Sequence, residues 1–169
     1  MKISFHEVLL KKRFPLEISR GVNSESSNVF VRVEENGLIG WGESAPGNTE
    51  GATNTKEVIA QLQQLIDINI KEKSIYEIEK IAREMKISPC AFAGLDIALW
   101  DLKAKKAKMP LHKLLGLSLP KSKTSLTIGI MSPDSVKERI PLLFEGSSAK
   151  FIKVKLGSNK GLEADKAMY

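Results

Sequence analysis

The sequence predicts an α+β domain followed by the beginning of an α/β (TIM-like) barrel, and three observations support this fold class. Residues 1–43 contain segments of β-branched and aromatic side chains joined by Asn36-Gly37, a strong hairpin signal. Residues 55–107 repeat apolar side chains with a helical period. After Pro120 the pattern changes to strand, helix, strand, helix, which is typical of βα units in a parallel sheet or barrel.

The first segments predict a three-stranded antiparallel meander. One strand opens with Ile3 and Phe5, a second covers 28–33, and a third covers 38–43. Two stretches around these strands are polar or rich in small residues, and we expect both to be irregular loops that extend from the sheet: 13–27 and 44–53. Long loops without secondary structure are usually functional or disordered.

The helical part predicts three helices and one additional helical turn. The first covers about 55–70, and the second follows Ser74, which has Glu77 at the spacing of a capping box. The third begins at Ser88-Pro89, is rich in alanine and continues to about 107, so it should be deeply packed. The helical turn within 109–116 ends at a glycine, a common residue after a helix.

The βα pattern predicts strands over 124–131 and 151–156 and helices over 132–144 and from 161 onward. Because two such units cannot close a barrel, we expect the chain to be truncated relative to a complete barrel. We place the domain boundary between 118 and 119, with an N-terminal domain over 1–118 and an incomplete barrel domain over 119–169.

Composition narrows the possible partners. The apolar share of 42% and charged share of 27% are normal for a globular protein, and no apolar run reaches the ~18 residues of a membrane span. The net charge of +6 permits nucleic-acid binding, but the lysines of 103–108 end a predicted helix and no aromatic side chains are interleaved with them. We therefore expect neither a membrane nor a nucleic-acid partner. The single cysteine, Cys90, fits a packed thiol in the reducing cytoplasm.

The predicted strand 151–156 carries two lysines on one side. Residues two apart on a strand point to the same face, so Lys153 and Lys155 share a face with Phe151. Inside a barrel, desolvation and a neighbouring cation would favour a neutral amine that can act as a general base. The same alternation also describes an exposed edge strand with solvated lysines, and the alternation alone leaves both interpretations open.

Four segments occur in an order and spacing that indicate a family. They are Gly-Trp-Gly-Glu at 40–43, the helix motif at 91–103, Pro-Leu through Leu-Leu-Gly at 110–116, and Lys-Val-Lys at 153–155. This set resembles the muconate-lactonizing subgroup of the enolase superfamily, especially its dipeptide epimerases of the L-Ala-D/L-Glu type, although Gly94 replaces an alanine of the helix motif. The resemblance implies a capping domain joined to a modified barrel, and an isomerase that removes a proton α to a carboxylate.

The resemblance also assigns roles to individual residues. Lys155 matches the acid/base lysine, and Lys153 matches the companion that favours its neutral form and helps to hold the substrate carboxylate. Arg20 falls in the first loop, where similar epimerases read the distal side chain of the substrate. Thr127 falls at a substrate-contact position on the first barrel strand. The implied partner is a small carboxylate, a dipeptide, and the full-length form could be a homo-oligomer.

The resemblance implies Mg²⁺ as the cofactor, but it assigns no metal ligand to this chain. In the family the three metal carboxylates and the second acid/base lysine lie on later barrel strands. Glu43, Asp96 and Asp101 match positions in the cap and its packing helix, so we expect structural roles for them. We therefore expect this chain to be inactive by itself.

Two other interpretations remain open at this point. One is a related enzyme, a muconate-type cycloisomerase or an o-succinylbenzoate synthase, which the two predicted loops would distinguish. The other is a non-catalytic fragment that survives as a binding module, whose unpaired strand edges would make it prone to association.

Overall fold

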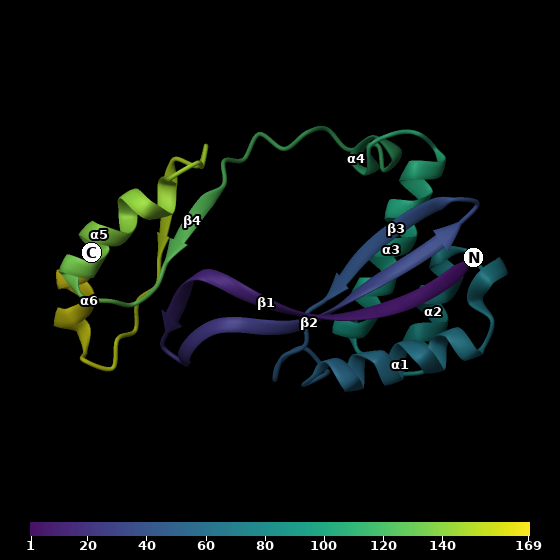
Figure 1. The fold of residues 1–169 in the computed structure, drawn as a ribbon, viewed down its shortest axis with the longest axis horizontal. Helices are drawn as coiled ribbons and strands as arrows, with labels where there is room; N and C mark the ends of the chain where they lie inside the picture. Colours follow the sequence, from purple (N-terminus) through teal and green to yellow (C-terminus); the bar gives the residue numbers. More distant parts are fainter. The chain divides into compact units, whose positions relative to one another are not determined.

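The computed structural model describes all of residues 1–169 and divides them into two compact units (Figure 1). The first unit contains Met1–Leu10 and Ser26–Leu119, and the second contains Lys11–Glu25 and Pro120–Tyr169. A segment near the N-terminus is therefore part of the unit formed by the C-terminal residues. None of the helices is long and apolar enough to cross a membrane.

The predicted meander is confirmed as a three-stranded sheet in the order β1-β2-β3. Strands β2 and β3 are antiparallel, with Val31 opposite Gly42. Asn36 and Gly37 between them both have positive φ, 51° and 77°, as the tight turn requires. The strand bounds are β1 (Lys2–Ile18), β2 (Gly21–Glu35) and β3 (Leu38–Ser44).

The prediction of an irregular loop over 13–27 is wrong. Strands β1 and β2 continue through this stretch to a two-residue turn at Ser19 and Arg20. Most of the side chains there are exposed, so the outer part of the hairpin has no buried face that would impose strict alternation of polar and apolar residues on both arms. Of the two predicted loops only the second is irregular, from residue 45 onward, because Ser44 still belongs to β3; it has a single bridge between Gly47 and Ala52.

The predicted helices are confirmed, and side chains cap the three longer ones. Ser74 and Glu77 form the complete capping box that their spacing predicts, and the Ser88 hydroxyl accepts a hydrogen bond from the Ala91 amide. The helices of the first unit are α1 (Thr55–Asp67), η1 (Ile70–Glu72), α2 (Ile75–Glu84), α3 (Pro89–Lys106) and α4 (Leu111–Leu114).

Helix α3 packs directly on β3, and three glycines make this close packing possible. A Cβ atom on Gly40 would lie 2.7 Å from the Leu102 amide nitrogen, and one on Gly42 would lie 2.7 Å from that of Ala98. A Cβ atom on Gly94 would collide with the Ser44 hydroxyl and lie 2.9 Å from Val31 Cγ2. The glycines of the Gly-Trp-Gly-Glu segment and of the helix motif therefore serve the core of the first unit.

The second unit contains the predicted βα units in shortened form. Strands β4 and β5 are parallel neighbours, as the alternation of strand and helix predicts, but each has only four residues because its ends continue as irregular backbone. Ser132 caps the first helix of this unit through the Ser135 amide. The elements are β4 (Ser125–Ile128), α5 (Pro133–Phe144), β5 (Phe151–Val154) and α6 (Leu162–Met168).

Candidate active site at the ends of β4 and β5

The lysine pair lies at the end of β5, beside β4. Lys153 pairs in register with Thr127, so these two side chains share one face of the two-stranded sheet. The Lys155 amide donates a hydrogen bond to the Ile128 carbonyl at 3.0 Å, which extends the ladder one residue beyond β5. Three of the four residues that the sequence nominates therefore lie together at adjacent strand ends.

The opposite face of the same sheet is apolar. Ile128 is only 2% exposed, and Val154, its partner in register, is half-buried. Leu156, the last residue of the predicted strand 151–156, lies beyond β5 and is 52% exposed. The two lysines differ from each other, because Lys153 is exposed and Lys155 is half-buried. Neither forms an ion pair in the structure.

The tip of the β1–β2 hairpin contacts both strand ends. The Ile130 amide donates to the Glu17 carbonyl at 2.9 Å, and a Cβ atom on Gly129 would lie 2.9 Å from the Glu17 backbone nitrogen. Gly157 has φ +99°, and a Cβ atom there would lie 3.2 Å from Ser19 Cβ. The hairpin backbone thus approaches the two segments that follow β4 and β5, where glycines leave room for it.

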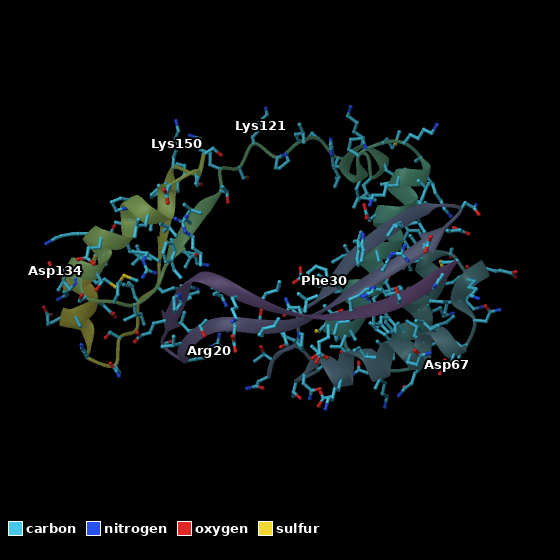
Figure 2. All side chains as sticks on the ribbon, in the orientation of Figure 1. Arg20, Phe30, Asp67, Lys121, Asp134 and Lys150 are labelled. Carbon is cyan, nitrogen blue, oxygen red and sulfur yellow. The ribbon has the colours of Figure 1, made fainter.

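Arg20 occupies the turn of this hairpin and is exposed (Figure 2). Its neighbour Ser19 contacts Gly157, only two residues after Lys155. The structure therefore brings the turn that carries Arg20 to the segment that follows the lysine pair. No hydrogen bond or ion pair joins the Arg20 side chain to another residue of this chain.

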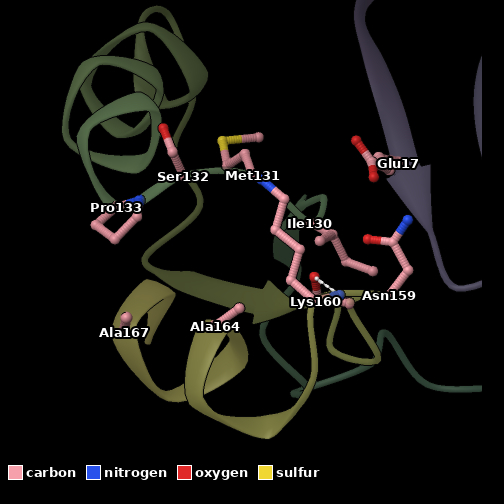
Figure 3. Close-up of a pocket in the computed structure, with 10 residues that line it drawn as sticks. Glu17, Ile130, Met131, Ser132, Pro133, Asn159, Lys160, Ala164 and Ala167 are labelled. Atoms are coloured by element: carbon pink, nitrogen blue, oxygen red, sulfur yellow. Dashed lines mark hydrogen bonds between the residues drawn. The ribbon is translucent and has the colours of Figure 1, made fainter.

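A cavity of about 290 Å³ lies beside these contacts (Figure 3). The segments after β4 and β5 line it together with Glu17 of the hairpin. The side chains of Glu17 and Asn159 point toward one another at one side, and Lys160 extends toward Met131 (Figure 3). The cavity therefore has a mixed polar and apolar lining that includes one carboxylate, Glu17, and one amine, Lys160, and neither of these two groups is in an ion pair.

Sequence reasoning missed the hairpin residues of this site. Phe14, Leu16 and Ile18 are half-buried, whereas the residues between them are exposed. This period of two was visible in the sequence, but the polar run of 11–13 before it and that of 23–27 after it obscured the pattern. This alternation of apolar residues is the signal in the sequence that indicates a strand through Glu17.

The three carboxylates for which we expect structural roles, Glu43, Asp96 and Asp101, are in structural contacts. Asp101 accepts hydrogen bonds from the Trp41 amide at 2.8 Å and from Lys105 Nζ at 2.7 Å, and Glu43 accepts one from Asn28 Nδ2 at 2.5 Å. Asp96 lies on α3, where burial raises its pKa, repulsion by Glu79 adds to the rise, and a hydrogen bond from the Trp100 side chain opposes it.

The chain contains no group of three or more His, Cys, Asp or Glu side chains that could hold a metal ion. The residues present here therefore do not fit the Mg²⁺ site that the resemblance implies for the family.

The comparisons with known proteins agree with the fold. The model for "Mandelate racemase / muconate lactonizing enzyme, N-terminal domain" matches residues 1–116. The chain therefore belongs to the mandelate racemase / muconate lactonizing enzyme family, and the resemblance to the enolase superfamily is confirmed.

Curated relatives match the whole chain but only part of their own length. A hydrophobic dipeptide epimerase of Flavobacteria bacterium (strain MS024-2A) is 54% identical over 169 residues, which are 100% of this chain and 48% of the relative. The L-Ala-D/L-Glu epimerase of Escherichia coli (strain K12) is 34% identical over 86% of this chain and 44% of its own length. The chain thus spans about half the length of the curated relatives it matches.

Solved structures show the same arrangement of elements. The dipeptide epimerase from Enterococcus faecalis V583, complexed with Mg and the dipeptide L-Leu-L-Tyr, superposes with a TM-score of 0.83 at 26% identity. The match covers 98% of this chain and 47% of that structure. The dipeptide epimerase from Cytophaga hutchinsonii, complexed with Mg and D-Ala-L-Val, gives a TM-score of 0.81, also at 26% identity, over 98% of this chain and 46% of that structure.

Proposed function

We propose that this chain is the N-terminal part of an Mg²⁺-dependent epimerase that inverts a dipeptide at the carbon α to its carboxylate. The observation that carries the proposal is the position of Lys153 and Lys155 at the end of a parallel strand, with Thr127 on the neighbouring strand and the hairpin turn close to the segment that follows. Ligands of α/β folds bind at the carboxyl ends of parallel strands.

The proposed roles follow from the chemistry of each side chain. The neutral amine of Lys155 removes the proton from the α-carbon, and the electron pair of the broken C–H bond moves onto the carboxylate. A proton donor outside these 169 residues then delivers a proton to the opposite side of the same carbon, which completes the inversion. Lys153 provides a positive charge for the carboxylate, and the Thr127 hydroxyl beside it can donate a hydrogen bond to the same group.

Hydrophobic dipeptides are the substrate class that we propose. Two relatives named hydrophobic dipeptide epimerases are 54% and 48% identical to the whole chain, whereas the L-Ala-D/L-Glu epimerase of Escherichia coli is 34% identical. The Arg20 side chain would then contact the backbone or the terminal carboxylate of the dipeptide, because a hydrophobic dipeptide has no acidic side chain.

The proposal assigns the Mg²⁺ found in related structures to ligands outside these 169 residues, since no suitable cluster lies within them. We also propose that the capping domain ends near 118 and that the barrel domain begins near 119. A cytoplasmic location is consistent with the single cysteine.

The test is proton exchange in the complete protein that carries this chain. With Mg²⁺ in D₂O, NMR should show deuterium entering the α-carbon of hydrophobic dipeptides faster than that of Ala-Glu. Lys155→Met should reduce the exchange rate by about 10²- to 10⁴-fold, the usual contribution of a general acid or base. Lys150→Met, which changes an exposed lysine just before β5 in the same way, is the matched control.

Two results would contradict the proposal. If the complete protein exchanges no dipeptide of a broad panel, the epimerase assignment is wrong, and a cycloisomerase or a non-catalytic module becomes the better hypothesis. If Lys155→Met retains the rate of Lys150→Met, the assignment of the acid/base residue is wrong even if the activity is present.

A further inference from the structure

Phe14 of the hairpin has two guanidinium groups near its ring. The guanidinium carbon of Arg139, on α5, is 4.1 Å from the centre of the Phe14 ring, and that of Arg13 is 5.0 Å from it. Phe14 and Arg139 are both half-buried. A cation over an aromatic face is attracted by the ring quadrupole, and partial loss of water strengthens this attraction.

One of these two cations, Arg13, is paired with a carboxylate that directly follows α5. Arg13 Nη2 lies 2.5 Å from Glu145 Oε2. This ion pair is exposed, with 57% and 66% of the two side chains accessible, so it is individually weak. It places a negative charge next to Arg13, which reduces the repulsion between the two guanidinium groups near one ring. Arg13, Phe14, Arg139 and Glu145 are called the docking cluster below.

The docking cluster is the first of three anchors along one extended segment. The second is the hydrogen bond from the Ile130 amide to the Glu17 carbonyl, and the third is the contact of Ser19 with Gly157. A strand advances about 3.3 Å per residue, so the cluster lies roughly 20 Å along the chain from Arg20. The second and third anchors are close approaches of backbone, for which Gly129 and Gly157 leave room. The docking cluster is the anchor that consists of charged and aromatic side chains.

We propose that Arg139 is a positioning residue of the active site: by docking Phe14 on α5, it holds the hairpin turn of Arg20 at the end of β5. The inference rests on the proposed function, because it concerns the same site. Its role is to hold the hairpin and not to contact the substrate. Loss of docking should therefore weaken substrate binding and leave the proton transfer by Lys155 unchanged.

The experiment compares Arg139→Gln with Lys137→Gln in the complete protein. Both substitutions remove one positive charge from α5, but Lys137 is exposed and pairs only with Asp134 of the same helix. Arg139→Lys, which keeps a cation over the ring, is the conservative variant. For Arg139→Gln we expect KM for hydrophobic dipeptides to rise about fivefold, with kcat changed less than twofold. Arg139→Lys should recover part of the loss, and Lys137→Gln should behave as wild type.

An activity-independent measurement separates this inference from the proposed function. Hydrogen exchange of the Ile130 amide reports whether the Glu17 carbonyl remains bound to it. Exchange of this amide should become about fivefold faster in Arg139→Gln and should not change in Lys137→Gln. If the complete protein is inactive on dipeptides while Ile130 exchange responds as expected, the epimerase assignment fails but the docking by Arg139 stands.

The inference is overturned in either of two ways. Equal Ile130 exchange in Arg139→Gln and Lys137→Gln would show that Arg139 does not hold the hairpin. A fall in kcat at constant KM would show that the residue affects the chemical step and not the position of the hairpin.

Discussion

Substitution of Gly42 by alanine tests the packing of α3 on β3. The added Cβ atom would lie 2.7 Å from the Ala98 amide nitrogen and closer still to the Gly94 carbonyl oxygen, whereas ordinary contact begins at 3.4 Å. Both obstacles are backbone atoms, so no side chain can rotate away. Strand β3 and helix α3 must therefore move apart until the 2.7 Å distance becomes an ordinary contact of 3.4 Å.

The magnitude follows from that separation. A radial gap of about 0.5–1 Å already loses a quarter to a half of the dispersion energy between the surfaces that separate. Overpacked cores typically lose about 1–3 kcal/mol, and because rigid backbone opposes the new atom we expect the upper end, about 3 kcal/mol. For a chain of this length that loss corresponds to a decrease in Tm of about 6–12 °C.

The assay is unfolding by urea and by heat, followed through the fluorescence of Trp41 on β3 and Trp100 on α3. Gly47→Ala is the matched control, because its Cβ atom would meet only Cγ of the flexible Glu50 side chain, at 3.3 Å. It should change stability by less than about 0.5 kcal/mol, the usual range for surface substitutions. If Gly42→Ala is no less stable than Gly47→Ala, the close approach of α3 to β3 is not as described.

Two other single substitutions have expected outcomes. Ser74→Ala should lower the free energy of unfolding by about 1 kcal/mol through loss of the N-cap, with Ser122→Ala in a loop as the control. Hydrogen bonds from Ser74 lower the pKa of Glu77 below its ordinary value of 4.5, so this stabilisation is present above that value and is lost as the pH falls through the lowered pKa. The difference between Ser74→Ala and wild type should therefore shrink in acid, and a constant difference would contradict the capping box. Asp96→Asn should stabilise the protein at pH 7. Burial, and then repulsion by Glu79, raise the pKa of Asp96 in the folded state above the ordinary value of 3.8. The ionised carboxylate therefore costs the folded state stability as the pH rises from 3.8 through the raised pKa. Equal stability of Asp96→Asn and wild type at pH 7, measured by urea unfolding, would refute this.

A double substitution addresses the position where this chain departs from the family motif. Gly94→Ala gains helix propensity of about 1 kcal/mol, but its Cβ atom would collide with the Ser44 hydroxyl. We expect net destabilisation in the wild-type background and a smaller effect, or a gain, in Ser44→Ala. The coupling energy from the double-mutant cycle should exceed about 0.5 kcal/mol, and additive effects would show that the hydroxyl is not the obstacle.

The sequence alone determined those parts of the fold that local chemistry specifies. The Asn36-Gly37 turn needs positive φ at both positions, which these residues accept. Ser74 and Ser88 satisfy free amides at helix starts whatever surrounds them. The parallel pairing of β4 with β5 follows from the alternation of strand and helix. Each of these features depends on a few neighbouring residues, so it can be read along the chain.

Only the tertiary structure decided what the outer hairpin and the glycines do. The stretch 13–27 has no continuous buried face, and its contacts with Ile130 and Gly157 come from residues more than 100 positions away. Gly40 and Gly42 are needed because α3, which is distant in sequence, lies directly against them. Lys153 and Lys155 could be predicted as a pair on one strand. Their neighbours in space, however, depend on the register of β4 and on the path of the hairpin. Such contacts depend on packing between distant segments, and no local pattern specifies them.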